Sequence, residues 1–271
     1  MRKSAFIVPV LLAIACNSTR TASTSIPPTP PIDAQRILSQ HGADAILWGS
    51  VSAEAHRSFQ QCFELAHIRL DQNLARVTSG IPAVIVDIDE TVLDNSLYEI
   101  HLVANEKLYE DDSWKQWTAM ARARAIPGSL EFLLHVAEKG CEVYYISNRH
   151  VSEGEATIRN LKDLGFPFAD QAHLLLMEES SDKTARRNLV SDKHPIVLLV
   201  GDQLRDFDEA FKDRSQDHGR TLVDDRIDTL SRYFILLPNA MYGTWRDAIQ
   251  GKGTPAEKLD RANEFFKRNS Y

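Results

Sequence analysis

Several features are scarce in this sequence, and each absence narrows the range of functions. No apolar run is long enough to cross a bilayer as a helix of the mature chain. Basic residues are in the minority, with 31 Lys and Arg against 38 Asp and Glu and a formal net charge of −7. This balance argues against binding of nucleic acid polymers, which needs clustered Lys and Arg. No internal repeat is visible.

Cysteine is also rare, with three among 271 residues. Cys62 falls on an expected helix, and Cys141 begins an expected core strand. Cysteine is among the residues most often buried as a free thiol, so we expect two thiols here. A disulfide between them stays open, because such a bond depends on a Cα separation that the sequence does not give.

The first 32 residues have the composition of a targeting segment followed by a tether. Arg2 and Lys3 precede a short apolar stretch at 5–15, and small residues lead into Cys16. The pattern resembles a bacterial lipoprotein signal, so we expect residues 1–15 to be a signal peptide and Cys16 to carry a lipid that anchors the chain to a membrane. Residues 16–32 comprise this cysteine and a Ser/Thr/Pro-rich stretch that cannot form a core and suits a tether. Plain secretion is the alternative.

The segment 33–271 is expected to be the folded domain, since short apolar runs alternate with helical patterns along it. Strands are expected at 83–87, 142–146, 172–176, 196–200 and 234–237. Helices are expected at 34–77 with a break near Gly49-Ser50, at 129–139, 152–164, 184–189, 205–214 and 255–267, with Ser152 as a cap and a helical insertion at about 95–125. Because strands alternate with helices, the pattern predicts an α/β fold with one parallel sheet flanked by helices.

Two acids follow the first of these strands. The apolar run 83–86 ends in Asp87 and Asp89, and residues two apart on an extended segment point to the same side. Ligands bind at the carboxyl ends of strands in open α/β sheets, so both acids are expected to face one ligand. Two carboxylates that close repel each other unless a cation or a proton lies between them. The pair therefore indicates a metal site, acid/base chemistry, or both.

The ends of the other strands carry polar residues as well. Ser147 ends the second strand, Lys183 follows the third, and Asp202 with Asp206 follows the fourth. Each element alone has an ordinary structural explanation, such as a helix cap or a turn. All of them in this order at strand ends are hard to obtain by chance.

This set resembles the haloacid dehalogenase (HAD) superfamily of phosphotransferases, and in detail the class C acid phosphatases of the bacterial lipoprotein e(P4) 5′-nucleotidase type. The resemblance rests on Val86 to Asn95, Trp114 with Trp117, Ile126 to Gly128, Tyr145 to Arg149, Gly201 to Phe207 and Leu237 to Trp245. The last segment and the tryptophan pair are specific to the subgroup. Ala240 departs from it, because the subgroup commonly has proline there. The resemblance implies a Rossmann-like sheet with a small, mainly helical cap.

The resemblance and the chemistry agree on the roles of the strand-end acids. Asp87 would be the nucleophile that forms an aspartyl-phosphate, and Asp89 would be the general acid and then the general base. Mg²⁺ would be held by Asp87, the backbone carbonyl of Asp89 and Asp202, with Asp206 positioning a metal-bound water. Ser147 would donate to the phosphate.

Further residues are predicted to contact the phosphate or the leaving group. Lys183 would neutralise the phosphate, and Asn148 would support the phosphate-binding loop. Trp114, Trp117 and Tyr242 would contact a flat leaving group, although tryptophans three apart on a helix are more often packing residues.

The leading interpretation is an exported, Mg²⁺-dependent phosphomonoesterase, lipid-anchored in the bacterial cell envelope, with the outer membrane favoured. The resemblance points to nucleoside monophosphates and similar aromatic phosphomonoesters as substrates, and to a homodimer. Two alternatives remain: a HAD phosphatase that prefers sugar phosphates, and an inactive surface lipoprotein that binds ligands on the same fold. The acids at positions 87, 89 and 202, together with Lys183, argue against the inactive alternative.

Overall fold

The computed structural model describes residues 33–271. The predicted signal peptide, the lipidation site Cys16 and the tether all fall within 1–32, outside the described residues. Over the described part of the chain, no helix combines the length and the apolar character that crossing a membrane requires.

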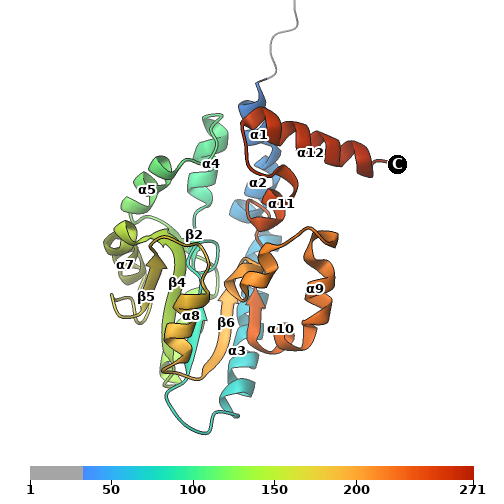
Figure 1. Ribbon diagram of the computed structural model, residues 1–271. Helices are drawn as coiled ribbons and strands as arrows, with labels where there is room; N and C mark the ends of the chain where they lie inside the picture. Colours follow the sequence, from blue (N-terminus) through green and yellow to red (C-terminus); the bar gives the residue numbers. More distant parts are fainter. Residues whose placement is uncertain (1–32) are drawn as a thin grey trace, which may run out of the picture. The chain divides into compact units, whose positions relative to one another are not determined.

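A five-stranded parallel sheet forms the centre of the domain (Figure 1). Its strands are β1 (Ala83–Val86), β4 (Glu142–His150), β5 (Leu174–Met177), β6 (Ile196–Gly201) and β7 (Phe234–Leu236), in the order β5-β4-β1-β6-β7. β1 lies in the middle, with Val84 opposite Val143 on one side and Leu198 on the other. All four residues of β1 are buried, as expected for a strand covered on both faces. The predicted α/β fold is confirmed.

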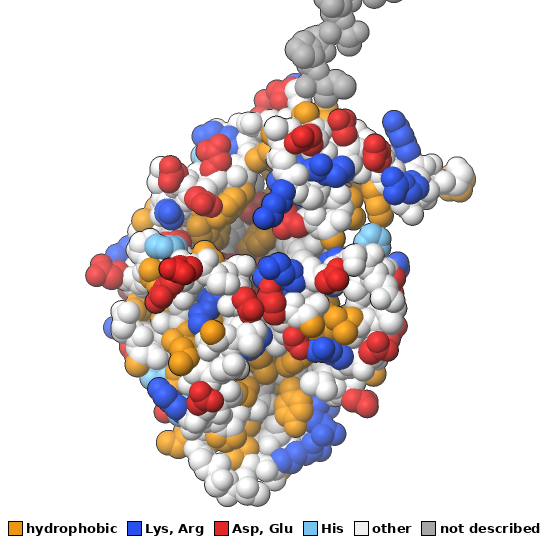
Figure 2. Space-filling view, in the orientation of Figure 1, with side chains coloured by type: hydrophobic (Ala, Val, Ile, Leu, Met, Phe, Trp, Pro, Cys, Tyr) orange, Lys and Arg blue, Asp and Glu red, His pale blue; other side chains and the backbone are white. Residues whose placement is uncertain are grey.

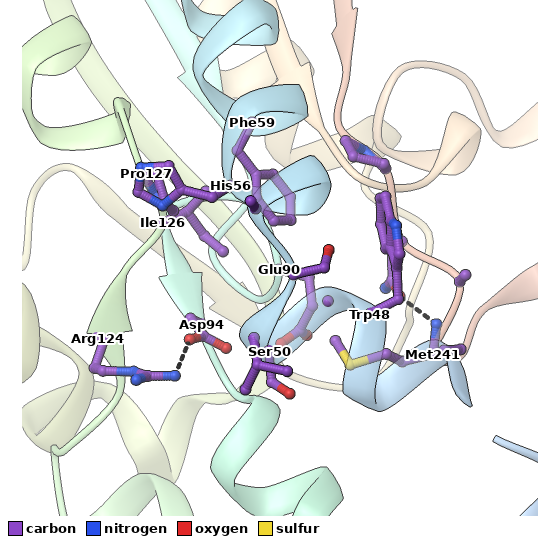
Figure 3. Close-up of a pocket in the computed structure, with 18 of the residues that line it drawn as sticks. Trp48, Ser50, His56, Phe59, Glu90, Asp94, Arg124, Ile126, Pro127 and Met241 are labelled. Atoms are coloured by element: carbon purple, nitrogen blue, oxygen red, sulfur yellow. Dashed lines mark hydrogen bonds and ion pairs between the residues drawn. The ribbon is translucent and has the colours of Figure 1, made fainter. Parts of the chain in front are cut away.

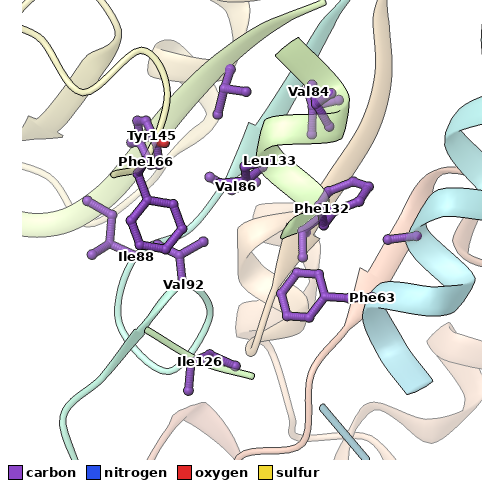
Figure 4. Packing of buried hydrophobic residues seen from close by; sticks show 14 of the residues in the cluster. Phe63, Val84, Val86, Ile88, Val92, Ile126, Phe132, Leu133, Tyr145 and Phe166 are labelled. Carbon is purple, nitrogen blue, oxygen red and sulfur yellow. The ribbon is translucent and has the colours of Figure 1, made fainter. Parts of the chain in front are cut away.

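Helices cover both faces of the sheet. The helices are α1 (Ala34–His41), α2 (Ala43–Val51), α3 (Ala53–Leu74), α4 (Ser96–Ala104), α5 (Asp111–Ala119), α6 (Ser129–Glu138), α7 (Gly154–Asp163), α8 (Thr184–Ser191), α9 (Arg220–Asp225), α10 (Ile227–Tyr233), α11 (Thr244–Gln250) and α12 (Pro255–Asn269). The larger core cluster joins α3 and α6 to the sheet, with Phe63, Phe132 and Val86 at its centre (Figure 4). A smaller cluster packs Val190 of α8 on Ile85 and Ile146 from the opposite face.

The helical insertion starts and ends at a short two-stranded stem. β2 (Leu93–Asp94) pairs antiparallel with β3 (Arg124–Ala125), and α4 and α5 lie between them in the sequence. The insertion therefore leaves and rejoins the domain just after the β1 loop that carries Asp87 and Asp89. α4 stands above the carboxyl ends of the strands (Figure 1).

The two ends of the described chain meet on the other side of those strand ends. α1 contacts α12 and α4, and α2 contacts α4, while α11 contacts α12. Figure 1 shows α1, α2 and α11 opposite α4 and α5. The sequence pattern did not predict α11, α9 or α10.

Local side-chain hydrogen bonds move several predicted boundaries. The break expected near Gly49-Ser50 lies at Ser52, whose hydroxyl accepts from the Ala55 N–H at 2.9 Å and starts α3. A further break at Gly42 separates α1 from α2. The helix expected at 205–214 is replaced by 3₁₀ turns at Leu204–Asp206 and Glu209–Lys212, because Asp208 is extended between them and accepts from Ala210 N–H.

The expected cap at Ser152 is also wrong. The turn Val151–Glu153 precedes α7, and the ring of His150 accepts from the Ser152 N–H. The Glu153 carboxylate in turn accepts from the His150 N–H at 2.7 Å. Cys62 and Cys141 are free thiols, as expected; Cys141 is buried, while Cys62 is only partly buried.

Candidate active site

The end of β1 places Asp87 at the edge of the sheet. Its backbone N–H donates to the Val200 carbonyl at 2.9 Å, which extends the β1–β6 pairing by one residue. Beyond it the chain turns sharply, because the Ile88 carbonyl accepts from the N–H groups of Val92 and Leu93, both at 2.9 Å. Glu90 adopts a left-handed φ of 57° within this turn. The turn is thus fixed by its own backbone, and it holds Asp87 and Asp89 in place.

Three of the predicted acids converge with the predicted lysine. Carboxylate oxygens of Asp87, Asp202 and Asp206 lie within 4.8 Å of one another, and all three residues are buried. The Lys183 ammonium donates to Asp87 and, at 2.7 Å, to Asp206. Lys183 is only 4% exposed, so its ion pairs are shielded from water. Asp206 was predicted to position a metal-bound water. In the structure its carboxylate also belongs to the acidic cluster itself.

The electrostatics of the cluster follow from its burial. Burial raises the pKa of Asp87 well above its usual range, and the neighbouring carboxylates add to this, while Lys183 opposes it. Burial and the charge of Asp206 raise the pKa of Asp202 to about 7, although hydrogen bonds from Asn239 and Gln203 oppose the shift. One ammonium among three carboxylates leaves an excess of negative charge, so the cluster retains protons in the absence of a cation.

This donor set fits a hard divalent cation. Carboxylate oxygens are the ligands that Mg²⁺ prefers, and a small cation with retained waters suits a group of three acids. A cation would also remove the repulsion among them. The surroundings hold the acids in position: Asp202 accepts from Asn239 at 2.7 Å and from Gln203 at 2.9 Å.

Asp89 is held apart from the acidic cluster by a buried arginine. Arg149 is 2% exposed and donates through Nη2 to Asp89 Oδ1 at 2.7 Å and through Nε to Asp89 Oδ2 at 3.2 Å. Asn95 donates to Oδ1 at 2.8 Å, and the Ser147 hydroxyl donates to Oδ2 at 3.3 Å. Such a two-pronged contact fixes the plane of the carboxylate. Asp89 therefore stands beside Asp87 with a defined orientation, as proton transfer requires.

The second strand end supplies the residues predicted to bind phosphate. Ser147 is fully buried, and its hydroxyl accepts from the Arg149 N–H at 3.1 Å. Arg186 donates to the Ser147 carbonyl at 2.6 Å and to the Asn148 side chain at 2.7 Å. This part of β4 is thus fixed by an arginine from α8. Asn148 reaches the cavity wall and is exposed.

These groups open into one cavity of about 530 Å³, which we call the catalytic cavity. Figure 2 shows the hollow above the strand ends, with hydrophobic side chains on its walls. The predicted residues that line it are Asp87, Asp89, Trp114, Ser147, Asn148, Lys183, Asp202, Asp206 and Tyr242. Its volume is that of a small-molecule site.

The two predicted tryptophans have different positions. Trp114 lines the cavity, where the Arg149 guanidinium lies 5.7 Å from its ring centroid and Tyr98 packs edge-on against it. Trp117 is not among the lining residues, and its indole N–H donates to the Asn95 side chain at 2.8 Å. The predicted substrate contact of Trp117 is therefore corrected: it supports Asn95, which supports Asp89.

Several residues of the site were missed by the sequence interpretation. Arg149 was named without a decided role, yet it lies two residues after Ser147 on the same strand, so it points to the same side. That spacing was the available signal. Asn95, Gln203 and Asn239 gave no such signal, because their partners lie on other segments.

Known proteins are similar to this chain. The model of the family described as HAD superfamily, subfamily IIIB (acid phosphatase), matches residues 10–245. The class C acid phosphatase from Bacillus anthracis has a similar structure, with a TM-score of 0.80 and 37% identity over 84% of this chain and 97% of that one. The same enzyme with tungstate bound gives a TM-score of 0.79 and 36% identity over the same shares of the two chains.

A plant protein is similar over a shorter stretch. Acid phosphatase 1 from Solanum lycopersicum is 29% identical over 131 residues, or 45% of this chain, and the match spans half of the plant protein. The family model covers most of the chain, with the strand ends that form the site inside it. The resemblance inferred from the sequence is confirmed: the chain belongs to the HAD superfamily, subfamily IIIB, the acid phosphatases.

Proposed function

We propose that this protein is a metal-dependent acid phosphatase that hydrolyses phosphomonoesters through an aspartyl-phosphate. The observation that carries the proposal is the cluster of Asp87, Asp202 and Asp206, in which Lys183 binds Asp87 and Asp206. Asp89 lies beside this cluster and is held by Arg149. One carboxylate is placed to attack and a second to move protons, and both face one cavity. Few other reactions need this combination.

The steps follow from these positions. A carboxylate oxygen of Asp87 attacks phosphorus and the ester P–O bond breaks, while protonated Asp89 gives its proton to the leaving oxygen. Asp89 then takes a proton from water as the water attacks the aspartyl-phosphate, which releases phosphate and restores Asp87. Lys183 and the Ser147 hydroxyl stabilise the charge on the phosphoryl oxygens. Mg²⁺, held by Asp87, the Asp89 carbonyl and Asp202 with Asp206 beside them, would add positive charge at the same oxygens.

The substrate class follows from the walls of the cavity. Trp114 and Tyr242 place aromatic side chains there, and aromatic rings stack on flat groups such as nucleobases. This favours nucleoside monophosphates over sugar phosphates. A Trp114→Ala variant is expected to raise the KM for nucleoside monophosphates and leave the KM for a sugar phosphate unchanged. An equal change for both substrates would favour the sugar-phosphate alternative.

The proposed location rests on residues 1–32. Arg2 and Lys3, the apolar stretch and Cys16 support export and lipid anchoring in a bacterial envelope, with the outer membrane favoured. Homodimer formation is proposed from the family alone. Metabolic labelling with a fatty acid is expected to mark the wild-type chain and not a Cys16→Ser variant, and labelling of both would contradict the assignment.

The activity is tested on the full chain with p-nitrophenyl phosphate. We expect Mg²⁺-dependent release of p-nitrophenol that EDTA abolishes and that an Asp87→Asn variant lowers by about 10⁴-fold or more, as for loss of a nucleophile. Asp112→Asn, an exposed acid of α5, is the matched control and should retain activity. Equal activity in Asp87→Asn, with thermal stability preserved, would refute the phosphatase proposal. A fully inactive wild type would favour the ligand-binding alternative.

A further inference from the structure

A second cavity lies behind the loop that carries the catalytic aspartates. It has a volume of about 490 Å³ and is lined by residues from α2, α3, the β1 loop, β3 and the segment after β7 (Figure 3). None of its described lining residues also lines the catalytic cavity. We call it the Glu90 cavity, after the acid at its inner end.

A thin wall separates the two cavities. Asp89 lines the catalytic cavity, and the next residue, Glu90, lines the other. In the same way, Tyr242 lines the catalytic cavity and its neighbour Met241 lines the Glu90 cavity. Glu90 has a positive φ, so the chain turns at this residue. Neighbouring residues of one loop therefore line two separate cavities.

Glu90 is a buried acid with an unsatisfied oxygen. The residue is 2% exposed, and its Oε1 accepts from the Asn95 N–H at 2.9 Å. Its Oε2 has no hydrogen-bond partner within residues 33–271. A buried carboxyl oxygen without a partner costs free energy, and native structures contain few of them. Such an atom at the edge of a cavity indicates a ligand that brings the missing donor.

The charge around Glu90 sets the sign of that ligand. No ion pair involving Glu90 is present in the described part of the chain, and Arg124 at the cavity is already paired with Asp94 at 2.7 Å. A cationic donor would satisfy the unmet hydrogen bond of Oε2 and pair with the carboxylate.

The walls set the shape of the ligand. Trp48, Phe59 and Met241 line the cavity together with Ile126, so most of its surface is apolar. In Figure 3 Glu90 lies between Trp48 on one side and the Asp94–Arg124 pair on the other. Aromatic rings attract organic cations through their faces and pack on apolar groups. Val51, which is 77% exposed, also lines the cavity.

We propose that the Glu90 cavity binds a small organic ammonium ion with an apolar body. The ammonium group donates to Oε2 of Glu90, and the body packs between Trp48 and Phe59. The volume exceeds that of a single-ring amine and is typical of small-molecule sites. This site is independent of the proposed phosphatase reaction, because it shares no lining residue with the catalytic cavity within 33–271.

The test measures binding of three ring-matched probes by isothermal titration calorimetry. Benzylamine is cationic, benzyl alcohol neutral and benzoate anionic at neutral pH. The full chain is saturated with Mg²⁺ and inorganic phosphate, which occupy the catalytic cavity. We expect benzylamine to bind at millimolar concentration or better, and at least tenfold more tightly than the other two probes.

Three variants locate the binding. Glu90→Gln keeps an acceptor for the Asn95 N–H and removes the charge, so benzylamine affinity should fall at least tenfold. Glu54→Gln, an exposed acid on the neighbouring first turn of α3, is the matched control and should bind as the wild type does. Ala45→Met places a larger side chain on the half-buried cavity wall without touching Glu90, and it should block the probe.

The outcomes separate the possibilities. Equal affinity for benzylamine and benzyl alcohol would overturn the proposal, because the cavity would then select only for an apolar body. Unchanged affinity in both Glu90→Gln and Ala45→Met would also overturn it, as would loss of binding when Mg²⁺ and phosphate are added. If Glu90→Gln fails to fold, the Ala45→Met result decides alone.

Discussion

The two cavities on either side of the β1 loop differ in the partners that they give to their acidic side chains. In the catalytic cavity, Asp87 and Asp206 share the Lys183 ammonium, and Asp89 is bound by Arg149. In the Glu90 cavity, a carboxyl one residue away from Asp89 has a single hydrogen bond from the backbone. Asp87, Asp89 and Glu90 belong to one short segment, and Asp87 and Glu90 are both buried.

The difference shows what a buried acid needs. Buried charge is tolerated where cations and donors surround it, and the surrounding groups then fix its position for chemistry. Three basic residues belong to the hydrogen-bond network on the catalytic side. They are Arg149 of β4, Arg186 of α8 and Lys183, which directly precedes α8. On the side of Glu90, the arginine of the cavity wall within the described chain, Arg124, is paired with Asp94 and not with Glu90. The first arrangement suits a reaction, and the second suits capture of a cationic ligand.

The largest expected effect comes from removing the lysine of the catalytic side. Lys183→Met leaves Asp87 and Asp206 buried without their cation, which costs about 3–5 kcal/mol when one partner of a buried pair is lost. We expect kcat for p-nitrophenyl phosphate to fall by about 10³-fold, as for a lost charge-stabilising group. Urea unfolding in EDTA measures the stability. Lys193→Met, exposed after α8, is the control, and a similar loss there would contradict the assignment.

A smaller effect is expected at the arginine that orients Asp89. Arg149→Gln removes the two-pronged contact, so kcat should fall by about 10²-fold with little change in KM, since a misaligned proton donor slows only the chemical step. Arg124→Gln breaks the ion pair with Asp94 beside the Glu90 cavity and is expected to leave kcat within about twofold. Equal losses in the two variants would break the distinction between the cavities.

The pH dependence of stability sharpens the comparison through Glu99, on the wall of the catalytic cavity. Burial raises the pKa of Glu99 from 4.5 to about 7, with Arg246 opposing. An acid whose pKa is higher in the folded protein favours folding at low pH, and this contribution is lost as the pH rises through about 7. Metal-free protein is therefore expected to become less stable between pH 5 and pH 8.

The Glu99→Gln variant isolates this group. It should flatten the profile by about 1–3 kcal/mol, since one pKa unit corresponds to about 1.4 kcal/mol. Thermal unfolding in EDTA across this pH range measures it. Glu131→Gln, an exposed acid on α6, should keep the wild-type slope. A profile in Glu99→Gln as steep as that of the wild type would show that other acids, with Asp202 foremost, cause the whole effect.

The smallest effect separates the two tryptophans. Trp117→Phe removes one donor to Asn95, which is expected to cost about 1 kcal/mol of stability and to lower kcat by up to about tenfold with KM unchanged. Trp114→Phe changes the wall that faces substrate, so it should alter KM for nucleoside monophosphates more than kcat. Steady-state kinetics with both variants measures the contrast, and a KM effect at Trp117 would restore the predicted substrate contact.

Much of the catalytic side was predictable because it depends on local chain geometry. Apolar runs such as 83–86 identify the strands, and the first residues beyond parallel strands meet at one edge of a sheet. The order of the residues alone therefore predicts that Asp87, Asp89, Ser147, Lys183 and Asp202 lie together, and all of them line one cavity.

The contacts between distant segments were not predictable in the same way. Whether Trp117 faces substrate or Asn95 depends on the rotation of α5 against the β1 loop, and its spacing from Trp114 permits both. The wall formed by α1, α2 and α11 joins residues about 200 positions apart in the chain, and no local pattern records such a contact.

The sequence by itself determined the parallel sheet, the family, and the acids and the lysine that meet at the edge of the sheet. These features depend on apolar runs and on the polar residues that directly follow them, and both can be read from the order of the residues. Only the tertiary structure decided how these charges are divided. Arg149 reaches Asp89 because β4 lies beside β1, while the left-handed backbone of Glu90 places its side chain at the other cavity, where Arg124 is paired with Asp94 instead. Electrostatic energy depends on distances of a few ångströms, and those are set by packing between segments.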